Sequence, residues 1–426
     1  MRHLPQGLTP GMAGRLFYGW IVAGVVFVAW AISIGPRQCF SIFLLAFLQD
    51  FGWSRSATAA VFSIHMTCYA LGGWVLGALV DRLGPRRVIA WSTCAWILVL
   101  VLCSQVQSLW QLYLVYGVLG GVATSGLAYV PVNTLLSRWF IRYRGRATGI
   151  TQAGVPMGTA VFGPLAQLGI TLLGWRMTHV GFGLLIAITS LPLVLWFLRD
   201  DPREMGLVPD GIPVAARNPD GSGRSASRGD GFSGPGLPRG YWLVFGANVF
   251  RGMTMYAILI HQVAYLVDAG FTRMAAASYF SVSSFIAAPA GFTAGAISDR
   301  LGRSRTYAGI ASMYVIAYLS LLLVRHPSAG VWLYAFVLSA GIAAGGSTSV
   351  FAAFLTDRLQ GPRVGFLLGL QNIGFGLGAT FGPFLAGAVF DLLGSYTAVF
   401  LLMAATGMGS AAVVSLSTRR PSVTRV

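Results

Sequence analysis

Two loops of the chain carry nearly the same eleven residues, GALVDRLGPRR at positions 77–87 and GAISDRLGRSR at positions 295–305. Two shorter turns also match, DFGWSR from Asp50 to Arg55 and DAGFTR from Asp268 to Arg273. The glycines that follow match as well, with Gly149, Gly154 and Gly158 against Gly369, Gly374 and Gly378. Because the offset between matching positions drifts by only two residues, the chain is an internal repeat of one unit.

Composition places this repeated unit in a membrane. The 426 residues are 55% hydrophobic and 10% charged, with a mean hydropathy of +0.70. A soluble globular protein uses about 25% charged residues to cover its surface. This chain therefore cannot be a soluble enzyme, a secreted disulfide-stabilised domain or a disordered protein, and most of its surface must face lipid.

Twelve apolar segments are each long enough to cross a bilayer, which takes about 20 residues of helix. They are residues 18–48, 57–80, 87–105, 109–134, 147–172, 178–198, 240–267, 274–297, 306–324, 330–355, 364–389 and 395–417. We predict an all-α membrane protein whose twelve transmembrane helices form two pseudo-symmetric bundles of six, residues 1–198 and residues 240–426. Residues 199–239 are rich in Gly, Ser and Pro, which is typical of a flexible linker.

The arginines indicate the topology. All 29 basic residues are arginine, against 12 acids, and most lie at the termini or in the even-numbered loops. The positive-inside rule then predicts that both termini are cytoplasmic, in a bacterial-type inner membrane. Because the positive charge follows the loops between spans, we expect no nucleic-acid partner. The four cysteines lie inside apolar segments without CxxC spacing, so we expect neither a metal nor another cofactor.

The loop at 77–87 resembles the loop 2–3 signature of the major facilitator superfamily, and the loop at 295–305 resembles its second copy. Residues 18–20 (YGW), 51–55 (FGWSR) and 138–140 (RWF) are similar to the monocarboxylate transporter and oxalate/formate antiporter branch. The resemblance implies a secondary transporter whose substrate site lies between the bundles and opens to one side at a time. It also implies a cytoplasmic gate, carried by Asp81, Arg82, Arg86, Asp299, Arg300 and Arg303.

The aspartates of the repeated loops also have a local role that follows from their position. Asp81 and Asp299 stand where one helix ends and the next begins. A carboxylate at such a place can cap the exposed backbone N–H groups of the following helix. The neighbouring arginines can bridge to the other bundle when the cytoplasmic side is closed.

Ionisable groups inside the spans are few and positive. Arg37 lies in the first span and Arg251 in the seventh, and no Asp or Glu lies well inside any span. A charge at mid-membrane costs about 2.5–3.5 kcal/mol even on the mildest scale, so we expect an anionic substrate to neutralise these guanidinium groups. The alternative is that each side chain extends to the membrane surface. Gly35-Pro36 precedes Arg37 and can interrupt the helix there.

Further candidate side chains are polar residues within the spans. His65 and His261 could hydrogen-bond the substrate or carry a proton, although a lone buried histidine often has only a packing role. The neutral candidates for substrate binding are Tyr129, Asn133, Gln152, Ser284, Gln371 and Asn372.

The chain departs from the resembled branch in helices 8 and 11. Monocarboxylate transporters carry an Asp/Glu–Arg pair in helix 8, and the oxalate exchanger carries an arginine there and a lysine in helix 11. Here residues 278–289 contain no charge, and helix 11 offers only Gln371 and Asn372. The positive charge lies instead at Arg37 and Arg251, so the identity of the acid and of the coupling ion stays open.

These observations predict a secondary active transporter for a small organic anion, with a monocarboxylate favoured, that works by rocker-switch alternating access. An anion entering a negative-inside cell climbs about 2.3 kcal/mol per charge per 100 mV, so we favour proton-linked symport over anion exchange. The alternative is a multidrug or amphiphile exporter on the same fold, which would need a buried carboxylate. HExxH and GxSxG motifs are missing, so we expect no enzyme. The expected partners are the substrate, protons and the bilayer, around a monomer.

Overall fold

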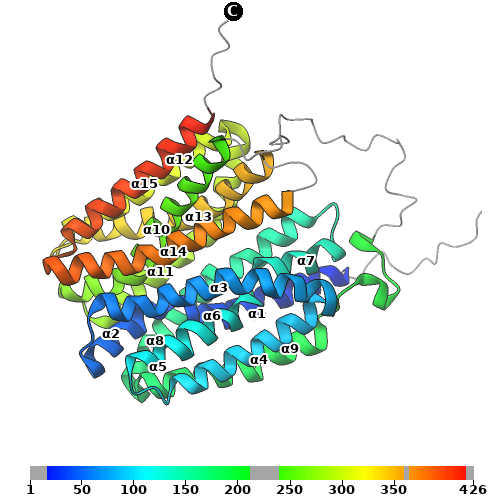
Figure 1. Ribbon diagram of the computed structural model, residues 1–426, viewed down its shortest axis with the longest axis horizontal. Coiled ribbons are helices and arrows are strands. Elements are labelled where there is room, and N and C mark those ends of the chain that lie inside the picture. Colours follow the sequence, from blue (N-terminus) through cyan, green and yellow to red (C-terminus); the bar gives the residue numbers. More distant parts are fainter. Residues whose placement is uncertain (1–16, 212–238, 359–363, 419–426) are drawn as a thin grey trace, which may run out of the picture.

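The computed structural model describes residues 17–211, 239–358 and 364–418, and this part of the chain is helical without any strand (Figure 1). The first half contains α1 (Tyr18–Gln38), α2 (Phe40–Phe51), α3 (Arg55–Leu83), α4 (Pro85–Cys103), α5 (Leu109–Leu112), the π-helical η1 (Tyr113–Leu119), α6 (Gly120–Ser125), α7 (Tyr129–Trp139), α8 (Arg144–Ile188) and α9 (Ser190–Phe197). The second half contains α10 (Arg239–Asp268), α11 (Arg273–Leu301), α12 (Arg303–Leu323), α13 (Gly330–Arg358), α14 (Val364–Leu393) and α15 (Tyr396–Thr418). The predicted all-α fold is confirmed.

The helices account for the expected spans. Among the described residues, 10 helices are long and apolar enough to cross a membrane, and the bent pair Arg55–Gly73 and Val75–Leu83, which meets at 42°, brings the number to 11. One of them, Arg144–Phe197, has 54 residues and would extend about 80 Å, far more than one bilayer. Its backbone leaves the helical conformation at Gly174, where φ is 77° and ψ is 161°. Dividing this stretch at Gly174 gives the twelve spans of the sequence.

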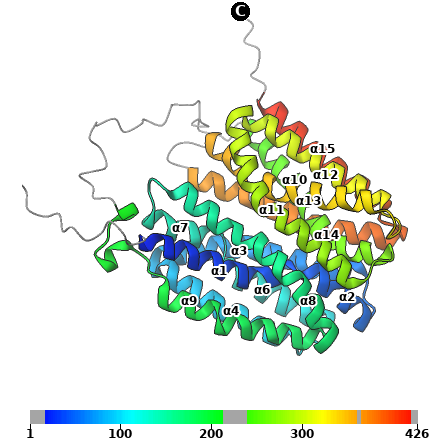
Figure 2. The ribbon, with the colours of Figure 1, turned by 180° about the vertical axis from the view of Figure 1, so that it is seen from behind.

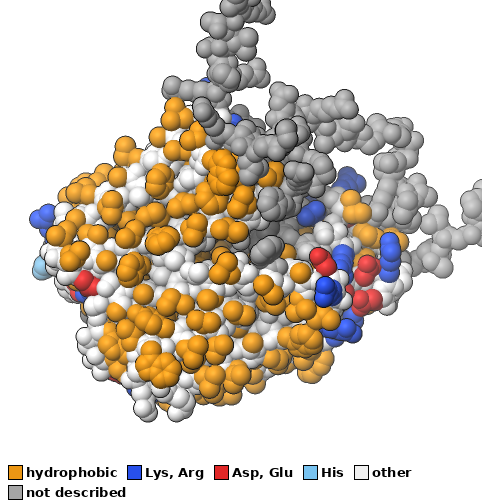
Figure 3. Space-filling model, viewed as in Figure 1, with side chains coloured by type: hydrophobic (Ala, Val, Ile, Leu, Met, Phe, Trp, Pro, Cys, Tyr) orange, Lys and Arg blue, Asp and Glu red, His pale blue; other side chains and the backbone are white. Residues whose placement is uncertain are grey.

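The two halves lie side by side as separate bundles, and the helix axes of both bundles are roughly aligned (Figures 1 and 2). They meet mainly where α3 packs against α14 and where α8 packs against α11. We call the end with the start of α1 and the end of α9 the linker end, and the opposite end, which contains the turn at Gly52, the hairpin end. Apolar side chains cover the flank in Figure 3, and charged side chains gather at its ends.

The beginning of the expected linker differs from the prediction. Residues 212–238 lie outside the described part, but residues 202–211 form two short 3₁₀ turns, η2 (Pro202–Met205) and η3 (Pro209–Gly211). The carboxylate of Asp210 accepts backbone hydrogen bonds from Ile141 (3.0 Å) and Arg142 (2.8 Å), which fixes η3 against the end of α7. An acidic side chain that satisfies free N–H groups thus orders a segment whose composition alone indicates flexibility.

The repeated glycines mark equivalent helix contacts in the two halves. Gly158 of α8 lies against α1, and a Cβ atom there would be 2.2 Å from the carbonyl oxygen of Ala31. Gly378 of α14 lies against α10, and a Cβ atom there would be 2.0 Å from the carbonyl oxygen of Val249. Both contacts are with backbone, which cannot move aside as a flexible side chain can. Small residues therefore allow the close helix approach in both bundles, as is common in membranes.

We expect Gly158→Ala and Gly378→Ala each to destabilise the folded protein by about 1–3 kcal/mol, because the added methyl group forces two helices apart. A lowered melting temperature of the detergent-solubilised protein would measure this effect. Gly181→Ala is the matched control, because Gly181 is also in α8 and has nothing within 4 Å of a Cβ atom. Equal melting temperatures for Gly158→Ala and the control would contradict the packing role.

Candidate functional site

Arg37 lies in the interior, at the point where the first span is interrupted. Pro36 stands in the last turn of α1, and Cys39 separates α1 from α2, as Gly35-Pro36 led us to expect. The Arg37 side chain is buried, with its guanidinium group 4.8 Å from the centre of the Tyr69 ring. Nη2 donates to the Gln38 side chain (3.1 Å), whereas Nε and Nη1 are buried without a hydrogen-bond partner in the described structure.

Arg251, on α10, is the second buried guanidinium group. Its Nε donates to Oδ1 of Asn248 (2.9 Å), one helical turn away. The guanidinium carbon lies 4.2 Å from the centre of the Phe375 ring and 4.9 Å from that of Phe351, so aromatic rings cover it. Nη1 is buried and has no acceptor among the described residues. The cation–π contacts compensate part of the lost hydration but supply no hydrogen-bond acceptor.

Asn248 fixes Arg251 through a short chain of hydrogen bonds. The Nδ2 group of Asn248 donates to the backbone carbonyl of Gln371 on α14 (2.6 Å). Because the amide nitrogen donates to this carbonyl, the other branch of the side chain, Oδ1, is the acceptor for Arg251. The same bond ties α10 to α14. The Gln371 side chain is buried and donates to the Tyr241 carbonyl (3.4 Å). The sequence analysis missed Asn248, although its place three residues before Arg251 on one helix was a usable signal.

A buried aromatic residue, Tyr256, connects the surroundings of the two arginines. Both guanidinium groups lie within electrostatic range of its hydroxyl group. Tyr256 also packs against Phe62 of the first half (5.7 Å between ring centres) and Phe375 of the second (5.8 Å). We call Arg37, Tyr69, Asn248, Arg251, Tyr256 and Phe375 the arginine cluster. Neither guanidinium group extends to the surface, and no acidic side chain in the described part pairs with either of them.

His65 is held inside the first half. Its Nδ1 lies 2.9 Å from the Tyr116 carbonyl oxygen, and its Nε2 lies 3.0 Å from the Thr124 hydroxyl. The carbonyl can only accept, so Nδ1 carries the hydrogen and Nε2 is the acceptor in a neutral ring. Both ring nitrogens are therefore engaged, and in this conformation His65 joins α3 to η1 and α6 rather than offering a free group to a substrate.

His261 is held at the hairpin end of the second half. Its Nε2 lies 2.9 Å from the Pro383 carbonyl oxygen, and its Nδ1 lies 3.1 Å from the Tyr396 hydroxyl. The same hydroxyl accepts a hydrogen bond from Nη1 of Arg55, in the first half, at 2.7 Å. The Tyr396 hydroxyl thus connects His261 to Arg55, across the interface between the two halves.

The other predicted site residues are only partly brought together. Gln371 joins the arginine cluster through its backbone, and the neighbouring Asn372 is exposed on α14. Ser284 and Gln152 are half-buried, and the Ser284 hydroxyl donates to the Phe280 carbonyl of its own helix (2.9 Å). Asn133 accepts a hydrogen bond from Thr148 (3.3 Å) within the first half. Tyr129 begins α7, and its side chain lies outside the described residues.

At the hairpin end the two halves are joined by a group of polar contacts that the sequence analysis did not predict. Arg55 forms a two-pronged ion pair with Asp268, at 2.8 and 2.9 Å. The backbone N–H groups of Arg55 and Ser56 donate to the two carboxylate oxygens of Asp391 (3.1 and 2.8 Å). Together with Tyr396, these residues form what we call the hairpin-end latch. The available signal was the repeated Asp and Arg of the DFGWSR and DAGFTR turns.

At the linker end the predicted gate residues contact only their own half. Arg303 pairs with Asp299 (2.5 Å) and Asp357 (2.9 Å), all in the second half. Asp81, Arg82 and Arg300 are exposed. Wherever both partners are described, the hydrogen bonds between the halves join residues 55–67 to residues 268–396, toward the hairpin end. The hairpin end is therefore closed by polar contacts, and the described linker end has none between halves.

The expected capping by Asp81 and Asp299 is wrong. The backbone N–H of Arg86, at the start of α4, donates to Asp200 (2.7 Å), and the Arg86 guanidinium group bonds to the Leu195 carbonyl. Asp200 therefore satisfies the helix end, from beyond α9. The start of α12 follows Gly302 and has no side-chain cap. Asp81 and Asp299 stand on the last turn of the preceding helix, before the glycine at which the chain reverses.

The fold and the buried charges define a class, a multi-pass membrane transporter built from two repeated bundles. The chain matches the Major Facilitator Superfamily model over residues 19–360, and it belongs to that family. It is a transporter and not an enzyme.

Several proteins are similar over almost the whole chain. Bovine Monocarboxylate transporter 13 is 28% identical over 418 residues, covering 94% of this chain and 89% of that protein. Human Monocarboxylate transporter 2 is 26% identical over 397 residues, covering 90% and 82%. The uncharacterised MFS-type transporter YcxA of Bacillus subtilis is 24% identical over 419 residues, covering 93% and 94%.

Solved structures agree on the fold. A point mutant of the nucleoside transporter NupG has a TM-score of 0.71 at 15% identity, covering 94% of this chain and 99% of that one. A bacterial homologue of the human lysosomal transporter Spinster has a TM-score of 0.66 at 18% identity, covering 95% and 98%. At these identities the likeness concerns the fold alone.

We expect Arg55→Gln to open the hairpin end, because the substitution removes the ion pair with Asp268 and weakens the bond to Tyr396. Spin labels at Trp110→Cys and Ser328→Cys, one in each half, would report the distance across this end after the four native cysteines are replaced. The distribution should shift to longer distances. Arg325→Gln, an exposed arginine at the same end, is the control, and an unchanged distribution in Arg55→Gln would rule out the latch.

Proposed function

We propose that this protein is a secondary active transporter for a small organic anion, with a monocarboxylate as the class of substrate. The observation that carries the proposal is the pair of buried guanidinium groups, Arg37 and Arg251, whose remaining N–H groups have no acceptor among the described residues. A carboxylate supplies both a negative charge and oxygens whose spacing matches the guanidinium fork.

The distribution of acids favours an anion over a hydrophobic cation. All 12 acidic residues of the sequence lie near span ends, in loops or in the linker, so no carboxylate within the membrane core is available to a cationic drug. A buried charge without a partner is costly, and a cationic substrate beside two arginines would add to that cost. The similarity to proteins named monocarboxylate transporters supports the same class of substrate.

The orientation follows from the arginine-rich loops. We place the linker end, with both termini, in the cytoplasm of a bacterial-type inner membrane, and the hairpin end outside. The conformation described here then has its external side closed by the latch. In a rocker-switch cycle the latch would break as the external side opens, and Asp81, Arg82, Arg86, Asp299, Arg300 and Arg303 would close the cytoplasmic side.

For coupling, we favour proton-linked symport over anion exchange, and we assign the proton to His261. In the closed latch Arg55 donates to the Tyr396 hydroxyl, whose own hydrogen is then directed to Nδ1 of His261. Nε2 is the N–H donor to the Pro383 carbonyl, so a neutral ring satisfies every contact. Opening of the latch would free Nδ1 to receive a proton from outside together with the substrate.

We expect Arg37→Gln and Arg251→Gln each to lower uptake at least about tenfold, because each loses a charge-assisted hydrogen bond to the substrate. Uptake of radiolabelled acetate, lactate and benzoate into proteoliposomes would measure this loss. Arg325→Gln is the matched control, since Arg325 is exposed in a loop.

A complementary variant is Asn248→Asp, which places a carboxylate beside Arg251 and neutralises it from within. This variant should lose uptake. Because an aspartate also loses the hydrogen bond to the Gln371 carbonyl, its melting temperature should fall, and uptake is therefore compared per amount of folded protein. Near-normal uptake in both Arg37→Gln and Arg251→Gln would refute the anion site.

We expect His261→Gln to abolish uptake driven by a pH gradient while leaving exchange of preloaded for external substrate intact. Exchange needs only the loaded carrier to change conformation, whereas net symport needs the proton site. His65→Gln is the comparison, because the bonds of His65 lie within one half. If His261→Gln keeps its response to the pH gradient, another group carries the proton.

A further inference from the structure

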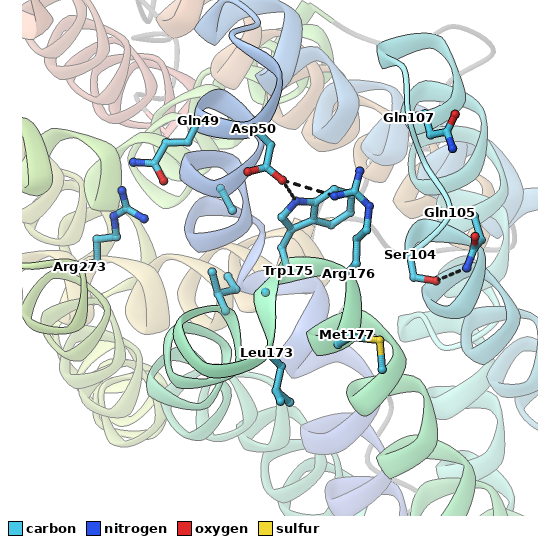
Figure 4. Close-up of a pocket in the computed structure, with 13 residues that line it drawn as sticks. Gln49, Asp50, Ser104, Gln105, Gln107, Leu173, Trp175, Arg176, Met177 and Arg273 are labelled. Carbon is cyan, nitrogen blue, oxygen red and sulfur yellow. Dashed lines mark hydrogen bonds and ion pairs between the residues drawn. The ribbon is translucent and has the colours of Figure 1, made fainter.

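A polar hollow of about 640 Å³ opens at the hairpin end, beside the latch. Figure 4 shows that α2, the turn before α5, and α8 line it, and that Arg273 of α11 lies opposite Gln49 and Asp50. In this hollow a charged side chain of the second half, Arg273, thus lies beside the end of α2 that carries Gln49 and Asp50.

The repeat predicts a second ion pair at this place. Asp50 corresponds to Asp268 and Arg55 corresponds to Arg273 in the two matching turns. The pair Arg55–Asp268 thus has a pseudo-symmetric counterpart, Arg273–Asp50, which would also join the two halves. Only the first of these two pairs is formed in the structure.

Asp50 is instead held by its own half. Its Oδ2 accepts hydrogen bonds from the Trp175 indole (2.6 Å) and from Arg176 (3.4 Å), and Figure 4 shows the carboxylate turned toward them. No hydrogen bond of Oδ1 appears in the described structure, so this oxygen is available to another donor. The Arg273 side chain is half-buried and forms no hydrogen bond or ion pair with any described residue.

The reason for the asymmetry lies in a second pair of matching turns. Leu172-Leu173-Gly174 corresponds to Leu392-Leu393-Gly394, so Arg176 occupies the position of Tyr396. In the second half Tyr396 is neutral and does not compete for Asp268, which pairs with Arg55 across the interface. In the first half Arg176 is a cation within reach of Asp50. Together with the Trp175 indole it holds Oδ2, so the charge of the carboxylate is already partly compensated and only Oδ1 is left for Arg273.

We propose that Asp50 is a switch between two arginines, held by Arg176 in the conformation described and paired with Arg273 in a more tightly closed hairpin end. The Asp50–Arg176 pair is easily exchanged, because at 3.4 Å it is long and both side chains are more than 40% exposed. Arg176 therefore weakens the closure of the hairpin end and makes it easier to reopen. A role of this switch in transport rests on the alternating access proposed above. The exchange of Asp50 between the two arginines is a conformational change that can be measured without transport.

The test replaces Arg176 by its counterpart in the second half. In Arg176→Tyr, Asp50 loses its rival cation, and we expect the distance between spin labels at Trp110→Cys and Ser328→Cys to shift to shorter values. The measurement uses the full chain in lipid nanodiscs without any substrate. Its failure would leave the anion site untouched, so the two proposals can be judged separately.

The double variant Arg176→Tyr/Arg273→Gln decides whether Arg273 is the partner. We expect it to return to the distance distribution of the parent protein, because the new ion pair cannot form. A shift that persists in the double variant, or no shift in Arg176→Tyr, would overturn the switch. Arg325→Gln combined with Arg176→Tyr is the matched control and should keep the shorter distances.

Discussion

The structure depends on one electrostatic constraint, two guanidinium groups that stay charged in an apolar interior. Arg37 is covered by Tyr69, and Arg251 by Phe351 and Phe375. Gln38 accepts one hydrogen bond from Arg37, and Asn248 accepts one from Arg251. Aromatic faces and amide oxygens lower the cost of burial but leave a net positive charge. Under the proposed function, this remaining positive charge is what would give the interface between the bundles a preference for negative groups.

Features encoded by local sequence could be predicted well. The spans follow from apolar length, the duplication follows from matched turns and glycines, and Arg37 and Arg251 are conspicuous because charges are rare in apolar helices. The repeated glycines were also informative, because the same backbone approach recurs at Gly158 and Gly378.

Features that need distant partners could not be predicted. The latch joins Arg55 to residues more than 200 positions away, and nothing in a single turn indicates that Asp268 and Asp391 converge on it. Asp200, which follows α9, caps the start of α4, so Asp81 does not have the capping role that we expected. The histidines illustrate the same limit, since only the fold shows that His65 is enclosed in one half and that His261 borders the interface.

The two rings around Arg251 also have a steric consequence. With Phe375 at 4.2 Å and Phe351 at 4.9 Å, and with Nε occupied by Asn248, the terminal nitrogens are the part of the guanidinium group that is left for a further acceptor. For the anion proposed above, rings this close to the guanidinium carbon would leave more room for a flat carboxylate than for a tetrahedral sulfate or phosphate.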